Sequence, residues 1–96
     1  MAITVRYTKQ ARNDLKNALE YIAVERSSAA RAVAKVIETV IAELADHPDR
    51  GRPGRIADTR ELVIPRLPFV VTYRVTTTHV DVLAILHGAR RWPSSL

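Results

Sequence analysis

The chain has 96 residues, the size of one small domain, so we expect a single domain over residues 1–96. It contains no cysteine, which excludes disulfides and thiolate chemistry and favours a reducing, cytoplasmic location. No window is apolar enough to span a membrane, and the first ten residues lack the apolar core of a signal peptide, so we expect no membrane contact.

The positive charge is concentrated in the second half of the chain. The formal net charge is +5, and all eight basic residues of the stretch 47–96 are arginines, against four acidic residues. A guanidinium can bind a carboxylate or a phosphate through two parallel hydrogen bonds. We therefore expect these arginines to bind an anionic partner, although a charge of this size could also serve solubility alone.

Apolar spacing predicts a short strand and then two helices. Residues 3–7 alternate in polarity, which predicts a strand, and Thr8 offers a hydroxyl that could cap a following helix. Apolar residues then recur at helical spacing over residues 9–25, and again from Ser27 or Ser28 to about Asp46. Because so few residues separate the two helices, we expect them to form an αα-hairpin.

The apolar period changes from that of a helix to that of a strand after residue 58. Residues 47–58 are rich in glycine and proline and predict a loop. The stretches 61–64, 69–75 and 80–86 then predict three antiparallel strands. The predicted fold class is therefore α+β, in the order β-α-α-β-β-β, with a helical hairpin packed on one face of a small antiparallel sheet.

A turn at Thr77 and Thr78 fixes the expected register of the last two strands. Residues whose numbers sum to 155 should then lie opposite each other, so that Arg74 faces Asp81. One face would carry no charge and would receive the helices; its residues are Phe69, Val71, Tyr73, Val75, Val80, Val82, Ala84 and Leu86. The other face mixes apolar and charged residues, so we expect something to cover it; its residues are Val70, Thr72, Arg74, Asp81, Leu83, Ile85 and His87.

Metal and nucleotide sites have no support in the sequence. The three histidines are scattered over loop, turn and strand end, with no cysteine beside them, and no phosphate-binding glycine motif occurs, so we expect no metal and no cofactor. The stretch RGRPGR, residues 50–55, resembles a minor-groove hook. Because it forms a tight link between two elements, we expect it to dock an acidic protein segment and not to contact nucleic acid directly.

Four residues are candidates for catalysis: Glu61, Arg74, His87 and Arg90. Arg74 could instead form a cross-strand ion pair with Asp81. Glu61, which lies beside Arg60 in the sequence, is equally ambiguous between a catalytic and a structural role. His87 could act as a general acid or base near neutral pH, or could simply hydrogen-bond a neighbouring carbonyl.

Three sequence stretches, in this order, resemble the RelE/ParE superfamily of type II toxin-antitoxin toxins: TRELVI at 59–64, PFVVTYRV at 68–75 and HGARRWP at 87–93. RelE-like members cut messenger RNA on the ribosome with several cations and a tail tyrosine, whereas ParE-like members poison DNA gyrase by binding. Aligned on Tyr73, this chain has Glu61 and Val63 at the lysine positions and Val70 at the strand arginine; only Arg90 matches, and no tyrosine follows Tyr73. The resemblance therefore implies the ParE-like branch.

That branch implies a gyrase inhibitor held inactive by a cognate antitoxin with an acidic, disordered tail, the two forming a hetero-oligomer. We expect contacts with the target or the antitoxin from Arg50, Arg52, Arg55, Arg60, Arg90, Arg91 and Trp92. Trp92 could alternatively cover the open sheet face at Val70, Leu83 and Ile85. Two further alternatives are a ribosome-dependent endoribonuclease that uses Glu61, Arg74, His87 and Arg90, and a toxin-fold protein that has lost its activity.

Overall fold

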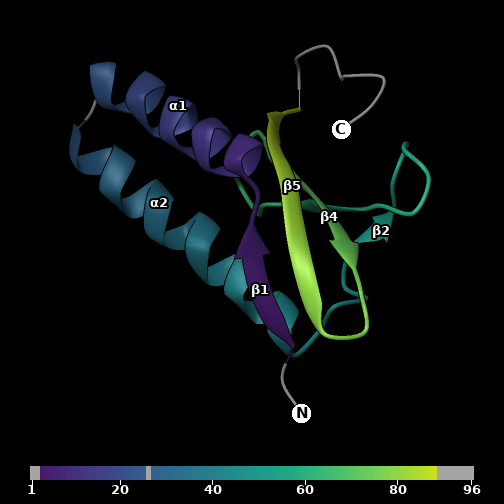
Figure 1. The fold of residues 1–96 in the computed structure, drawn as a ribbon. Coiled ribbons are helices and arrows are strands. Elements are labelled where there is room, and N and C mark those ends of the chain that lie inside the picture. Colours follow the sequence, from purple (N-terminus) through teal and green to yellow (C-terminus); the bar gives the residue numbers. More distant parts are fainter. Residues whose placement is uncertain (1–2, 26, 89–96) are drawn as a thin grey trace.

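The helical hairpin forms where the apolar spacing predicts it. The computed structural model describes residues 3–25 and 27–88, with helices α1 (Lys9–Glu25) and α2 (Ser27–Ala42) followed by a short 3-10 turn, η1 (Glu43–Ala45). The Thr8 hydroxyl accepts the Ala11 N–H at 3.1 Å and so caps α1, as expected. The two helices lie side by side along one face of the sheet (Figure 1).

The sheet has five strands in the order β1-β5-β4-β3-β2. Their bounds are β1 (Thr4–Tyr7), β2 (Arg52–Pro53), β3 (Arg60–Val63), β4 (Phe69–Val75) and β5 (His79–His87). The α+β prediction and the antiparallel meander β3-β4-β5 are confirmed. The sheet is mixed, however, because β1 pairs in parallel with β5, and the predicted loop contains the two-residue strand β2. A local apolar pattern does not indicate which distant strand an element will join.

A bulge in β5 changes the predicted register partway along the strand. Tyr73 lies opposite Val82 as predicted, but Thr72 lies opposite Ala84, so Leu83 is the extra residue. The Thr8 hydroxyl donates to the Leu83 carbonyl at 3.1 Å, which ties the bulge to the start of α1. Beyond the bulge the predicted faces were therefore wrong, since Ile85 and His87 turn towards the helices while Ala84 and Leu86 turn away.

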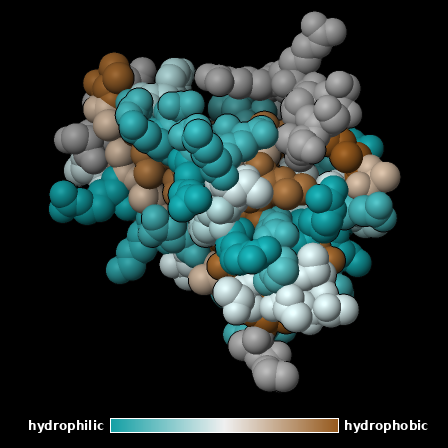
Figure 2. Space-filling view, viewed as in Figure 1, coloured by the Kyte–Doolittle hydropathy of each residue, from teal (hydrophilic) through white to brown (hydrophobic). Residues whose placement is uncertain are grey.

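The core lies between the hairpin and the helix-facing side of the sheet. Its fully buried large side chains include Ile37, Ile41, Leu44, Ile64, Val71, Tyr73, Val80 and Val82. On the surface seen in Figure 2, hydrophobic residues form small patches between hydrophilic ones. Among the described residues, no helix has the length and apolar character needed to cross a membrane.

Candidate binding surface

The basic segment, residues 50–60, is organised around one buried carboxylate. Only 2% of the Glu61 side chain is exposed, and its two oxygens lie 3.2 Å from Arg52 Nη2 and 3.9 Å from Arg55 Nε. The Arg55 backbone N–H also donates to Glu61 Oε2 at 2.8 Å. A carboxylate with this many donors is well compensated for its burial, so Glu61 holds the segment against the sheet.

The phenol of Tyr73 fixes the start of the same segment from the core side. Its hydroxyl donates to the Pro48 carbonyl and accepts the Gly51 N–H, both at 2.8 Å. A Cβ on Gly51 would lie only 2.7 Å from this hydroxyl, so a glycine is needed for the close approach. Burial raises the pKa of Tyr73, so the phenol stays protonated and keeps its role as a donor.

Each arginine of the basic segment lies near a carboxylate. Besides the two that meet Glu61, Arg50 lies 3.5 Å from Glu43, and Arg60 lies 3.7 Å from Asp49. Their side chains are nevertheless 36–58% exposed. The segment thus presents guanidiniums to solvent in a fixed arrangement, in which a partner's carboxylates can compete with the internal ones.

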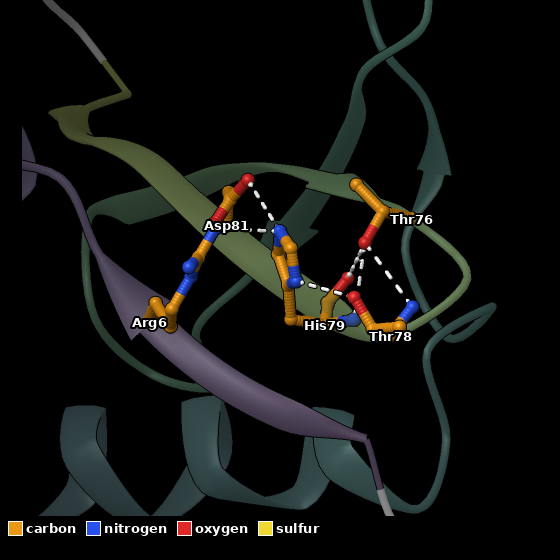
Figure 3. Close-up of polar contacts among 5 residues, drawn as sticks. All are labelled: Arg6, Thr76, Thr78, His79 and Asp81. Carbon is orange, nitrogen blue, oxygen red and sulfur yellow. Dashed lines mark hydrogen bonds and ion pairs between the residues drawn. The ribbon is translucent and has the colours of Figure 1, made fainter.

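A second charged cluster, which the sequence did not predict, joins β1 to the start of β5 (Figure 3). Arg6 Nε donates to Asp81 Oδ1 at 3.2 Å, and Arg6 Nη2 lies 2.6 Å from His79 Nε2. The other ring nitrogen of His79 lies 2.7 Å from Thr78 Oγ1. Through these contacts the cluster ties the edge strand β1 to the start of β5.

The predicted ion pair of Arg74 was wrong. Arg74 does lie opposite Asp81, but within the described part of the chain that carboxylate pairs with Arg6 and with His79, at 3.3 Å. The competition comes from β1, whose parallel pairing with β5 places Arg6 directly beside Asp81. No sequence motif marks Arg6 or His79, so the cluster could be found only from the pairing of distant strands.

His87 is the last residue of β5, and its side chain lies on the side of the sheet that faces the helices. Its ring meets Phe69 edge-on, with the ring centroids 5.7 Å apart, and it lines a cavity of about 390 Å³ against α1. On the α1 side, Asp14 accepts the Ile85 N–H at 3.0 Å, and burial raises the pKa of its carboxyl. The bulge thus places His87 on the opposite side of the sheet from Glu61 and Arg74.

The described residues do not bring the four catalytic candidates into one site. Glu61 is bound by Arg52 and Arg55, and His87 faces α1, while Arg90 lies outside the described residues, as do Arg91 and Trp92. The open face expected for Trp92 is also altered, because Ile85 is part of the core. Across residues 3–25 and 27–88, no three acidic or histidine side chains gather in a way that could hold a metal ion.

The fold and sequence identify the family. Residues 5–92 match the family described as "ParE toxin of type II toxin-antitoxin system, parDE". The chain belongs to this toxin family. It is 37% identical over 92 residues to "Putative toxin Y4kP" of Sinorhizobium fredii, with 96% of this chain and 95% of that protein covered. It is also 36% identical to "Toxin RelE2" of Caulobacter vibrioides, covering 88% of this chain and 93% of the relative.

Two solved structures share the fold of this toxin. One, described as "Chromosomal ParDE TA system from P. aeruginosa", has a TM-score of 0.82 at 22% identity, covering 90% of this chain and 96% of the other. The second is the toxin-antitoxin complex RelBE2 from Mycobacterium tuberculosis, with a TM-score of 0.61 at 26% identity, covering 91% and 99%. The resemblance expected from the three sequence stretches is confirmed at the level of the RelE/ParE superfamily.

Proposed function

We propose that this toxin inhibits growth by binding DNA gyrase directly, without cutting RNA. The observation that carries this proposal is the state of Glu61. At a position where RelE-like toxins use a lysine, this chain has a buried carboxylate that is already bound by Arg52 and Arg55. A buried carboxylate that is bound in this way supplies neither a cation for a phosphodiester nor a free base, and His87 lies on the other side of the sheet.

The proposed antitoxin is a small protein whose acidic, disordered tail folds onto the toxin and keeps it inactive in a hetero-oligomer. Both related solved structures are described as toxin-antitoxin systems or complexes. The exposed guanidiniums of the basic segment offer a matching surface for such a tail. Arg90, Arg91 and Trp92 complete the proposed contacts with the antitoxin or the target.

The deciding experiment compares two targets in purified systems. Toxin is added to gyrase with relaxed plasmid, and separately to translating ribosomes with a defined transcript. We expect loss of supercoiling or accumulation of cleaved plasmid, reversed by antitoxin, and an intact transcript. Codon-specific transcript cleavage with unaffected gyrase would instead establish the RelE-like alternative, and inactivity in both systems and in cells would indicate a toxin fold that has lost its activity.

The proposed contacts are tested by variants of the basic segment and of residues 90–92. Arg52→Gln should weaken antitoxin binding and make it less sensitive to salt, because one screened charge pair is lost. Trp92→Ala and Arg90→Ala should reduce growth inhibition without changing thermal stability. If these variants inhibit growth as efficiently as the wild type, Arg90 and Trp92 do not contact the target.

A further inference from the structure

The turn between β3 and β4 holds an arginine in an unfavourable backbone conformation. The Leu67 N–H donates to the Ile64 carbonyl at 3.3 Å, which closes a four-residue turn with Pro65 in its second position. The third residue, Arg66, has φ of 65°, the pattern of a type II turn. That position favours glycine or asparagine, because a Cβ there crowds the following peptide. The chain therefore tolerates local strain to keep an arginine at this position.

Arg66 differs from the arginines of the basic segment in its surroundings. It is exposed, and within residues 3–25 and 27–88 no carboxylate pairs with it, whereas each arginine of the basic segment has one. Among the described residues, no ion pair or side-chain hydrogen bond of Arg66 holds the turn in place. A strained backbone conformation that brings no visible stabilising contact is typical of functional positions.

The turn also has the composition of a protein contact. Next to Arg66, the exposed residues are Pro65, Pro68 and Val63, and 52% of the Val63 surface is accessible. A single guanidinium set among rigid apolar residues is characteristic of protein interfaces, whereas nucleic acid binding usually needs several cations along a groove. A carboxylate on a protein partner is the chemistry that fits.

The position of the turn separates it from the basic segment. The basic segment leads into β3 at Arg60, and the turn follows the other end of that strand, after Val63. The Gly88 N–H donates to the Pro68 carbonyl at 2.7 Å, so the turn lies beside the point where the chain leaves β5. Residues 89–96, which carry Arg90, Arg91 and Trp92, begin at that point.

We propose that Arg66 is a target-contact residue, whose guanidinium binds a carboxylate on the protein that the toxin inhibits. This proposal rests on the proposed function in one respect, that the toxin acts by binding a protein target. It places part of the target surface at the β3–β4 turn and leaves the antitoxin tail to the basic segment.

The test uses two glycine substitutions that relieve the same kind of strain. Arg66→Gly removes the guanidinium and the strain together. The matched control is Asp58→Gly, because Asp58 is the other described non-glycine residue with a positive φ, at 62°. Asp58 lies in the basic segment, which we assign to the antitoxin, so this control is compared for growth inhibition by the toxin alone. A third variant, Arg66→Lys, keeps a positive charge in the strained turn. Growth inhibition on induction, antitoxin affinity and thermal stability are measured for the full chain.

We expect Arg66→Gly to lower growth inhibition by about tenfold or more, as for an interface hot spot, while its Tm stays equal to or above that of the wild type. The antitoxin affinity of Arg66→Gly should equal that of the wild type. Asp58→Gly should remain as toxic as the wild type, and the growth inhibition by Arg66→Lys should lie between that of the wild type and that of Arg66→Gly. Full toxicity of Arg66→Gly would overturn the proposal, and so would an equal loss in Asp58→Gly or a wild-type chain without toxicity. If the wild type stops growth while gyrase is unaffected, the gyrase assignment fails but the Arg66 comparison is still decided.

Discussion

The two faces of the sheet are closed by different kinds of interaction. On the helix-facing side, Val71 and Val82 pack against Ile37 and Ile41 in a continuous apolar core. On the opposite side, the carboxylates of Glu61 and Asp81 hold arginines from other segments of the chain. Apolar packing thus fixes the scaffold, whereas ion pairs arrange the charged surface that we assign to partner binding.

Adjacent residues of β4 show the same difference at the level of single hydroxyls. Tyr73 belongs to the apolar core, yet its hydroxyl has two hydrogen-bond partners. Thr72 faces the other way and is 1% exposed, and its hydroxyl has no partner in the described structure. The tyrosine is therefore the structural link between the two faces, and the threonine is a weak point of the polar face.

The largest expected effect comes from removing the carboxylate of Glu61. Glu61→Ala should lower the free energy of unfolding by about 2–3 kcal/mol, because the Arg55 N–H loses its acceptor and two neighbouring guanidiniums lose their shared counter-charge. Urea denaturation measures this loss. Glu61→Gln, which keeps an acceptor, should lose less. An alanine variant as stable as the wild type would show that the polar face is not held by this residue.

The second effect separates the Tyr73 hydroxyl from its ring. Tyr73→Phe should lower the free energy of unfolding by about 1–2 kcal/mol, because the Pro48 carbonyl and the Gly51 N–H lose their partner while the ring stays packed. Chemical denaturation is again the measurement. Tyr21→Phe is the matched control, since Tyr21 is 68% exposed and should be unaffected. Equal stability of both variants would contradict the link between the two faces.

The sequence predicted the helices, the strands and the start of the β4–β5 register far better than the features that depend on distant segments of the chain. The bounds of α1 and β4 and the strand register that places Arg74 opposite Asp81 follow from local periodicity and turn residues, and the structure agrees. The bulge at Leu83 could not be predicted, because it depends on a hydrogen bond from Thr8, which is distant in sequence. One extra residue then reversed the side on which His87 lies.

The charged contacts failed to follow from sequence for a related reason. An arginine next to a carboxylate in the sequence gives no information on which distant carboxylate it will meet. Glu61 meets Arg52 and Arg55 only because β2 folds back along β3, and Asp81 meets Arg6 only because β1 joins the sheet in parallel. The composition did indicate correctly that the second half of the chain carries an arginine-rich surface.

A smaller effect of opposite sign is expected at Thr72. Thr72→Val should raise the free energy of unfolding by about 0.5–1 kcal/mol, because valine has nearly the same shape and no buried hydroxyl to satisfy. Thermal unfolding gives the measurement, and Thr77→Val in the exposed β4–β5 turn is the control that should gain nothing. A loss of stability at Thr72 would mean that its hydroxyl does have a partner.

The smallest effect contrasts Glu61 with Asp14, a residue of α1 whose carboxylate contacts β5. Burial raises the pKa of Asp14, so the folded state binds its proton more tightly than the unfolded state does. The unfolding free energy contributed by this group is therefore greatest below the ordinary value of 3.8 and falls as the pH rises from there through the raised pKa. Asp14→Asn keeps an oxygen that can accept the Ile85 N–H but cannot ionise.

Thermal unfolding across this pH range should therefore show a stability of Asp14→Asn relative to the wild type that increases with pH. Asp14→Ala is the control, because it removes both the ionisation and the acceptor and should lose stability at acid pH, where the wild-type carboxyl is protonated. A difference between Asp14→Asn and the wild type that stays constant with pH would show that burial does not disfavour the ionised carboxylate. The helix-facing side would then tolerate a charge as readily as the polar face does at Glu61.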